Sequence, residues 1–522
     1  MKIYFSGGLN EQQQPALNEA ASGSYNFDLS KDRNALIPRN PFDLIATAPN
    51  AGDIRGIMQL IDRDNAETTL VQAANTLYSW DGASSFTNVG SPNTASQLRG
   101  TYWSLDDYLL ITDLQKLTPV SNWNGTTFST QTTGLGATLY AKYAIVHNNR
   151  MWLFNVTTTT DTPHLIVASA FEDPTSYDTT SRATQGTFAT GLEAFYMLAP
   201  DYKPINGVAK TLAGDLIIST VEGALFKLTG VDPDTYEFKE FYPLSNAIGN
   251  ESMASMGNDI IYMRKHGSID LLSATQNYGD IAADDLSRWL PNTVSGLEGA
   301  IIVYDQFRQK VLFFVDSKVL VLFKDVLYGG ALIGESGERG KLSPWSVYRT
   351  QDSASFNTNA AAYIRIPSTS SYSVFFGSSN GRIFDLNGES VDGDAGASDI
   401  IVVRKTRYLS EADGTDFLRG INKARLRYRR INEIDFNVSM DWADEFTESQ
   451  STVVLKSDSS ANASYYGGSA YYAGPYYYGP SQTLGNKISH INFSFVGRGP
   501  GGTMTCSTTD NLAYQVEMIE LP

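Results

Sequence analysis

The side chains that could do chemistry in this chain are few and scattered. The chain holds four histidines among 522 residues, and its single cysteine is Cys506. The histidines are His147, His164, His266 and His490. Neither the H-x-x-x-H spacing of zinc hydrolases nor the P-loop of phosphotransfer proteins is present, and one cysteine excludes an intrachain disulfide framework or a thiolate zinc cluster. We therefore predict that the protein is not an enzyme and binds no cofactor or metal.

Carboxylates offer one alternative chemistry. Glycan-cleaving enzymes place two Asp or Glu side chains beside the scissile bond, and this chain has 56 acidic residues. The S-x-D-x-G-x-x-W box of sialidase-type propellers is absent, because the nearest fragment, which begins at Ser507, lacks the glycine and the tryptophan. A carbohydrate-binding or glycan-cleaving β-propeller therefore stays open as the alternative to a structural function.

A basic stripe runs along one expected strand, residues 423–430. Side chains two positions apart in a strand share a face, so one face would carry Lys423, Arg425, Arg427 and Arg429. In an acidic chain such a row suits the carboxylates of a neighbouring subunit. A solvated outer face and contact with DNA are the other interpretations. We take these four residues as a candidate subunit interface.

A tyrosine-rich stretch, residues 463–480, forms a second candidate surface. Tyrosine among glycine and serine is typical of adaptable recognition surfaces, where large rings gain contact area at low entropic cost. A loop packed on itself is the alternative interpretation. The candidate recognition residues are Tyr465, Tyr466, Tyr471, Tyr472, Tyr476, Tyr477 and Tyr478.

The elements that would position these groups are indicated by a recurring phrase: a short apolar strand, a tight turn with Gly or Asn, and a second apolar strand. It occurs at 69–82, 214–228 and 373–388, with weaker copies at 259–272 and 311–324. Each copy predicts a β-hairpin. Hairpins that return every ~40–50 residues have the spacing of propeller blades.

The phrase predicts an all-β fold with a β-propeller over residues 51–395. Units centred near Leu77, Ile111, Leu153, Leu225, Ile269, Leu320 and Ile383 give about seven blades, with six to eight possible. Polar residues near 156–200 predict a loop insertion. Residues 1–50 are expected to form an extended arm or a propeller-closing strand. Strict alternation in several segments of 396–522 predicts a C-terminal antiparallel β-sandwich.

The net charge and the hydropathy of the chain limit the kinds of partner that it can bind. A formal net charge of −17 argues against general nucleic-acid binding, which needs a basic surface. It is compatible with a passage that DNA slides through, because a repulsive wall does not hold a polyanion. No run approaches the ~18 apolar residues of a membrane span, and the first residues lack the apolar stretch of a signal peptide. We expect a protein made in the cytoplasm.

Three segments of the chain form a distinctive set. The opening has Ser6-Gly-Gly-Leu-Asn, followed by Gly-Ser-Tyr-Asn-Phe and Leu-Ile-Pro-Arg-Asn-Pro-Phe. The middle has residues 206–220, beginning Asn-Gly-Val-Ala-Lys. The end has Phe495-Val-Gly-Arg-Gly and Tyr514-Gln-Val-Glu-Met-Ile-Glu-Leu. In these segments and their order the chain resembles the tail nozzle proteins of short-tailed bacteriophages, also called tail tubular or DNA-stabilisation proteins.

This resemblance implies a structural protein of the virion tail. A nozzle would be a homo-oligomer, expected as a hexamer, that forms a ring around the DNA exit channel below the portal and adaptor. Its partners would be the adaptor or head–tail connector proteins, tail fibre or spike proteins, and passing genomic DNA without sequence-specific binding. The family implies a propeller in each subunit, a role in genome ejection, synthesis in the host cytoplasm, and no catalytic residues.

Overall fold

Many of the most apolar strands are buried along their whole length. β10 (Tyr108–Asp113) and β27 (Lys310–Val315) have no exposed residue, although neither strand alternates cleanly between apolar and polar side chains. In the computed structural model each is a middle strand of a propeller blade, with a neighbouring blade against both faces. A strand covered on both faces has a continuous apolar run.

The structure describes residues 2–520 with gaps. The gaps are 13–15, 17, 31–32, 94, 105–106, 131–135, 182–190, 243–250, 252, 258, 265–267, 273–283, 291, 293–296, 298, 316, 333–338, 350–356, 367–370, 388–401, 407–408, 411–423, 431–433, 443–447, 456–488, 494–500 and 509–513.

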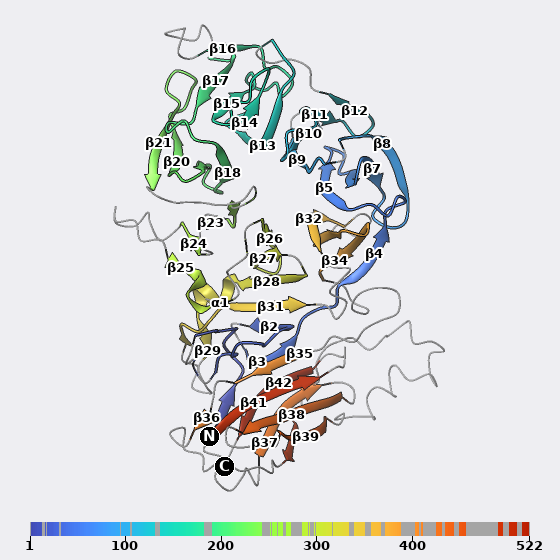
Figure 1. Ribbon diagram of the computed structural model, residues 1–522, viewed down its shortest axis with the longest axis vertical. Coiled ribbons are helices and arrows are strands. Elements are labelled where there is room, and N and C mark those ends of the chain that lie inside the picture. The colour runs from blue at the N-terminus through green and yellow to red at the C-terminus, as the bar shows by residue number, and fades with distance from the viewer. Residues whose placement is uncertain are drawn as a thin grey trace.

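Seven sheets of four or five strands form a ring (Figure 1). Blade 1 has β5 (Ile54–Ile61), β6 (Glu67–Ala73), β7 (Thr76–Trp80) and β8 (Phe86–Gly90). Blade 2 has β9 (Leu98–Trp103), β10, β11 (Ser121–Trp123) and β12 (Phe128–Thr130). Blade 3 has β13 (Tyr140–His147), β14 (Arg150–Thr157), β15 (Leu165–Ala168), β17 (Ala194–Leu198) and β16 (Thr179–Ser181). Blade 4 has β18 (Ile205–Lys210), β19 (Leu216–Thr220), β20 (Leu225–Thr229) and β21 (Glu237–Tyr242).

The other three blades follow the same plan. Blade 5 has β22 (Met253–Ser255), β23 (Ile260–Met263), β24 (Ile269–Leu271) and β25 (Asp284–Asp285). Blade 6 has β26 (Ile301–Asp305), β27, β28 (Lys318–Phe323) and β31 (Trp345–Arg349). Blade 7 has β32 (Thr358–Arg365), β33 (Tyr372–Ser378), β34 (Arg382–Asp385) and β4 (Asp43–Thr47). Each of the seven residues on which the sequence pattern centred a unit lies in a different blade, so the predicted propeller is confirmed.

Blade 7 is assembled from both ends of the propeller. Its first three strands come from the end of the propeller sequence, and β4 comes from before blade 1. Antiparallel pairing of β4 with β34 places Ala46 opposite Ile383 and Asp43 opposite Asp385. The first strands of successive blades lie beside one another around the centre, and β32 lies beside β5, so this pairing completes the ring.

The polar stretch near 156–200 differs from the predicted loop insertion. β15 and β17 lie within it and pair with each other as strands of blade 3. The apolar residues of these two strands form short runs between long polar segments, so the polar composition of the whole stretch predicted a loop. Within blade 3, β15 pairs with β14 on one edge and with β17 on the other, and its alternate side chains pack against blades 2 and 4.

Helices in the described part of the chain are short. The spacing of residues 281–290 before Pro291 predicts a helix, but the described part of this segment holds strand β25 and the 3₁₀ helix η2 (Leu286–Trp289). The α-helix α1 (Lys324–Gly329) follows β28. Among the described residues, no helix has the length and apolar character needed to cross a membrane.

The second part of the molecule contains two antiparallel sheets drawn from both chain ends. One has the order β2 (Phe27–Ser30), β3 (Arg33–Pro38), β42 (Tyr514–Glu520), β37 (Ala424–Arg430) and β40 (Ser489–Phe493), with β1 (Lys2–Tyr4) also on β42. The other has β35 (Val402–Lys405), β41 (Gly501–Thr508), β38 (Ile434–Trp442) and β39 (Glu448–Leu455), with β36 (Leu409–Ser410) on β41. A short hairpin of β29 (Ala331–Leu332) and β30 (Arg339–Gly340) lies apart from both. Figure 1 shows β2 and β3, in blue, beside the red and orange C-terminal strands. Face-to-face packing of these sheets as a sandwich stays a prediction.

Residues 7–28 join the propeller to the second part. The amides of Gly8 and Leu9 donate to the carbonyls of Ser343 and Trp345 at the outer edge of blade 6, each at 2.7 Å. Farther along, Ala21 and Tyr25 donate to the carbonyls of Lys405 and Val403 in β35 at 2.8 Å. The segment therefore bonds to both parts at once.

We expect a methyl group added at Gly377 to destabilise the ring. The Cβ of an alanine there would lie 2.2 Å from Ile54 Cγ2 and 2.3 Å from Ile54 Cβ, across the contact between blades 7 and 1. Overpacking of this kind costs about 1–3 kcal/mol. Urea unfolding of Gly377→Ala should show a lower midpoint than the unmodified protein. An unchanged midpoint would contradict the tight contact between these two blades.

Candidate functional site

The centre of the propeller holds a cavity at one end of its inner strands. The cavity has a volume of about 220 Å³ and is lined by five blades, blades 2 to 6. Most of its lining residues lie near the N-terminal ends of the first strands of these blades. The lining includes Arg99, Lys142, Tyr143, Gly207, Val208 and Glu251, and we call this cavity the channel mouth.

An ion pair spans the channel mouth. Arg99 in blade 2 donates from Nε and Nη2 to the two carboxylate oxygens of Glu251, which directly precedes blade 5, at 2.5 and 2.7 Å. Blades 2 and 5 lie on opposite sides of the ring. The two side chains retain 21% and 24% of their exposure, so solvent reaches the pair. Two parallel charge-assisted bonds make this a strong and directional contact.

Arg99 is held in place by the backbone as well. Its Nη1 donates to the carbonyls of Arg55 at 2.8 Å and Leu98 at 2.9 Å. Burial by itself would lower the pKa of Arg99. The charge of the Glu251 carboxylate and its hydrogen bonds act in the opposite direction and dominate, so the net pKa is raised and the guanidinium stays charged. The Nε and Nη2 edge of the Arg99 guanidinium, which faces Glu251, would therefore keep its orientation if the Glu251 carboxylate moved away.

The inner strand of blade 3 brings two further groups to the mouth. Burial, followed by repulsion from Lys116, lowers the pKa of Lys142. Burial raises the pKa of Tyr143, and the charge of Glu251 adds to this effect, so the phenol stays protonated. The Tyr143 hydroxyl donates to the carbonyl of Asn206 at 3.0 Å and thereby ties blade 3 to blade 4.

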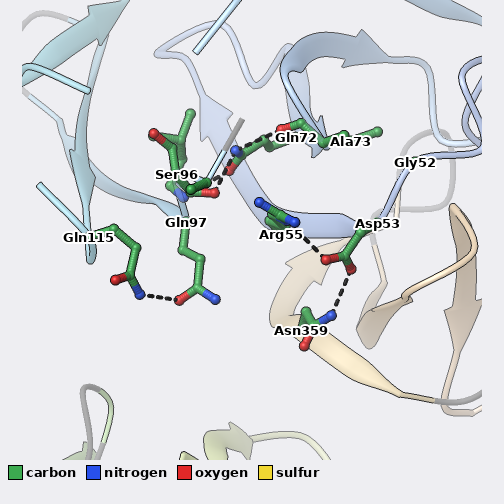
Figure 2. A network of polar contacts seen from close by, with 12 residues as sticks. Gly52, Asp53, Arg55, Gln72, Ala73, Ser96, Gln97, Gln115 and Asn359 are labelled. Carbon is green, nitrogen blue, oxygen red and sulfur yellow. Dashed lines mark hydrogen bonds and ion pairs between the residues drawn. The ribbon is translucent and has the colours of Figure 1, made fainter. Parts of the chain in front are cut away.

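Polar side chains fix the linkers beside the mouth, as Figure 2 shows. Asp53 accepts hydrogen bonds from Arg55 Nε at 2.9 Å and from Asn359 Nδ2 at 2.7 Å, which connects blade 1 to blade 7. The buried Gln72 of blade 1 donates to the carbonyl of Ser96 at 2.8 Å and accepts from the amide of Leu98 at 2.9 Å. Both groups hold the start of a neighbouring inner strand.

Asp113 organises the adjoining turn of blade 2. This carboxylate is 1% exposed and accepts from the hydroxyl of Ser96 and from the amides of Gln97, Leu117 and Thr118 at 2.8–2.9 Å. A buried carboxylate with this many donors is a structural group. It leaves no oxygen directed at the cavity to act as a general base.

The basic stripe predicted from sequence maps to β37, where only the backbone is described. Arg425, Arg427 and Arg429 occupy alternate positions, and Lys423 lies outside the described residues. Both edges of β37 are paired, with β42 on one side and β40 on the other. A contact with another subunit would therefore use the side chains of β37 and leave its backbone edges as they are. The assignment as a subunit interface stays a prediction.

The tyrosine-rich stretch lies outside the described residues. Its assignment as a recognition loop, through Tyr465, Tyr466, Tyr471, Tyr472, Tyr476, Tyr477 and Tyr478, stays a prediction. Of the histidines, His147 is buried at the end of β13, and His164 packs its ring edge-on against Tyr202. The part of the chain that the structure describes brings no three His, Cys, Asp or Glu side chains together in a group that could hold a metal ion.

Ser379 and Cys506 have side chains that could react, but neither lies in the surroundings that a nucleophile needs. Gly377-Ser-Ser-Asn-Gly381 spells G-x-S-x-G, but Ser379 lies in the turn between antiparallel strands β33 and β34. A nucleophile elbow needs a strand-to-helix turn. Cys506 is buried in β41, and burial raises the pKa of its thiol to about 12. It therefore stays a thiol at neutral pH.

The channel mouth is suited to binding charged groups. The planar guanidinium of Arg99 and the half-buried ammonium of Lys142 can hold an anion, while Glu251, the one carboxylate among the described lining residues, is already held by Arg99. Sequence reasoning missed the site because Arg99, Lys142 and Glu251 lie in three blades. The usable signal was positional: each charge stands at or near the start of an inner strand, where the side chains of all blades converge.

We expect His147 to make the protein acid-labile. Burial lowers the pKa of His147 to about 4, and Lys210 adds to this effect. The unfolded chain takes up a proton near pH 6.5, whereas the folded chain does not. Stability is therefore lost as pH falls from 6.5 towards 4, by up to roughly 3 kcal/mol at 1.36 kcal/mol per pKa unit. The thermal midpoint of His147→Phe, which keeps a ring against Trp152, should fall less over this pH range than that of the unmodified protein. Parallel curves would contradict this assignment.

Comparisons with known proteins concern the fold alone. No protein-family model and no curated protein matches the sequence. Among solved structures, a catalytically inactive virginiamycin B lyase from Staphylococcus aureus is 11% identical, with a TM-score of 0.41 over 66% of this chain and 98% of that chain. The extracellular domain of a one-component system from B. thetaiotaomicron is 8% identical, with a TM-score of 0.42 over 81% and 56%. The WD40 β-propeller domain of Doa1 is 10% identical, with a TM-score of 0.38 over 66% and 96%.

Proposed function

We propose that this protein is a structural component of a bacteriophage tail, namely the nozzle that forms a ring around the DNA exit channel. The single observation that carries the proposal is where the residues of the family resemblance lie. Those that are described lie in the junction between the two parts of the molecule and in paired strands, and none of them lines the channel mouth except Gly207 and Val208.

The opening phrase is built into the junction between the two parts. A Cβ on Gly8 would lie 2.1 Å from the carbonyl oxygen of Trp345, so only glycine allows this approach. Leu9 is 2% exposed and joins the core between blades 5 and 6. Asn10 donates to Glu19 at 2.6 Å, and Glu19 accepts the amide of Ser343 at 2.7 Å. These contacts fix the opening segment against blade 6, and the same segment bonds to β35 of the second part.

The other two segments support the same interpretation. Residues 206–220 form the inner part of blade 4, in β18 and β19. Of the final segment, residues 495–499 lie outside the described residues, and residues 514–520 form β42, which pairs with β37 on one side and with β1 and β3 on the other. A nozzle needs parts that stay rigid while DNA passes, and strands paired on both sides resist local opening.

Electron microscopy of the purified full chain tests the assembly. We expect a closed ring, with a hexamer as the leading expectation, and an axial opening wide enough for a duplex. The wall should be neutral or acidic, because a basic wall would bind phosphates and stall the DNA. A monomer at all concentrations, or an opening lined mainly by lysine and arginine, would contradict the proposal.

The basic strand gives a directed test of the ring. Changing Arg425, Arg427 and Arg429 to alanine should reduce the oligomer mass in light scattering, because a charge left without its buried partner costs roughly 2–5 kcal/mol. The matched control removes three positive charges from the exposed propeller surface, at Arg63, Lys203 and Lys239, and should leave the mass unchanged. Equal masses for both triple variants would place the interface elsewhere.

The competing function is a glycan-binding or glycan-cleaving propeller. The observation that favours it is the solvent-reached cavity at the channel mouth. Purified protein incubated with bacterial surface polysaccharides should release no reducing ends, because Glu251 is held by Arg99 and its partner carboxylate is not present in the lining. Release that disappears in Glu251→Gln would establish the glycan-cleaving alternative.

A further inference from the structure

The ion pair at the channel mouth has the geometry of a ligand complex. A carboxylate is bound by the fork of Arg99 Nε and Nη2, at 2.5 and 2.7 Å, in a cavity of about 220 Å³. This volume far exceeds the roughly 10–15 Å³ that one water molecule needs. The place occupied by the Glu251 carboxylate could hold the carboxylate of another molecule.

The binding half of this pair is preorganised. Arg99 Nη1 is fixed by the backbone carbonyls of Arg55 and Leu98, so the fork stays directed at the cavity when Glu251 leaves. Preorganised donors bind more tightly because less conformational freedom is lost. Glu251 itself lies in a turn before β22, outside any strand. Its displacement would break no strand pairing.

Other groups in the lining suit an acidic ligand. The Lys142 side chain lines the same cavity, and nearby Lys116 repels its charge, so a bound anion would be favoured there. On the same wall, Gly207 leaves no room for a larger residue, since a Cβ there would lie 2.6 Å from Ser219 Oγ. The cavity thus combines a planar fork for one carboxylate with a second cation and limited space.

We propose that the channel mouth is a binding site for a carboxylate ligand and that Glu251 is a tethered competitor occupying this site. The shared chemistry is a carboxylate on a short chain, supplied either by a free dicarboxylic acid or by a Glu side chain of another protein. A tethered competitor lowers the apparent affinity for a free ligand. Removing its charge should therefore increase binding.

The test measures binding of two probes to the full chain by isothermal titration calorimetry at low salt. Glutarate represents the free acid, and an acetylated, amidated Gly-Glu-Gly peptide represents the protein side chain. Glu251→Gln should bind at least one probe about tenfold more tightly than the unmodified protein, since the competitor is gone. The matched control is Glu237→Gln, which removes one exposed negative charge from β21 and should bind like the unmodified protein.

Two further variants assign the binding to the fork. Within Glu251→Gln, a second change of Arg99→Lys keeps the charge but loses the two-pronged geometry, and binding should fall back about tenfold or more. Lys142→Met should weaken binding without touching the Arg99 fork. Thermal unfolding midpoints check that each variant is folded.

The outcomes separate cleanly. Preference for glutarate identifies a free acid as the ligand, and preference for the peptide identifies a protein partner. Binding of neither probe by Glu251→Gln would overturn the proposal. So would equal binding by folded Glu251→Gln and the folded double variant with Arg99→Lys, or a gain in Glu237→Gln as large as that in Glu251→Gln.

Discussion

The antiparallel pairing of β4 with β34 holds blade 7 together and, through it, the whole ring. Each blade is stable only when a neighbour covers both of its faces, because its middle strands are apolar on both sides. If blade 7 were incomplete, the faces of blades 1 and 6 that pack against it would be exposed to solvent. Non-local pairing of this kind costs loop-closure entropy before the apolar contacts compensate for it, so the closing contact decides whether the buried strands stay buried.

The same N-terminal region that closes the ring also fixes the second part of the molecule. Buried charges at the junction are satisfied in pairs or by backbone carbonyls. Lys310 donates to Asp28 at 2.7 Å, and Arg404, whose pKa burial lowers to about 10, donates to the carbonyls of Gly7 and Asn18. Breaking such contacts one at a time leaves buried charges unpaired, which is unfavourable. The two parts are therefore expected to move together.

Ring closure also creates the channel mouth. Arg99 and Glu251 come from blades that are not neighbours, and only a closed ring brings them within hydrogen-bond distance. The ion pair joins two different blades and does not hold the strands of any one blade together. Its position across a solvent-reached cavity, with charges contributed by blades 2 and 5, distinguishes it from the buried polar groups that hold the linkers.

The sequence alone determined the propeller and limited it to six to eight blades, because each hairpin carries its own alternation and turn residues; the two-residue turn at Asn148 and Asn149, both with positive φ, is an example. The pairing of strands such as β15, a four-residue apolar run inside a polar stretch, with β14 and β17 was decided by the tertiary structure. So was the channel mouth, because Arg99, Lys142 and Glu251 are far apart in sequence and converge only when seven blades close a ring. Local interactions are encoded within short windows, whereas sites made between blades depend on contacts that no short window contains.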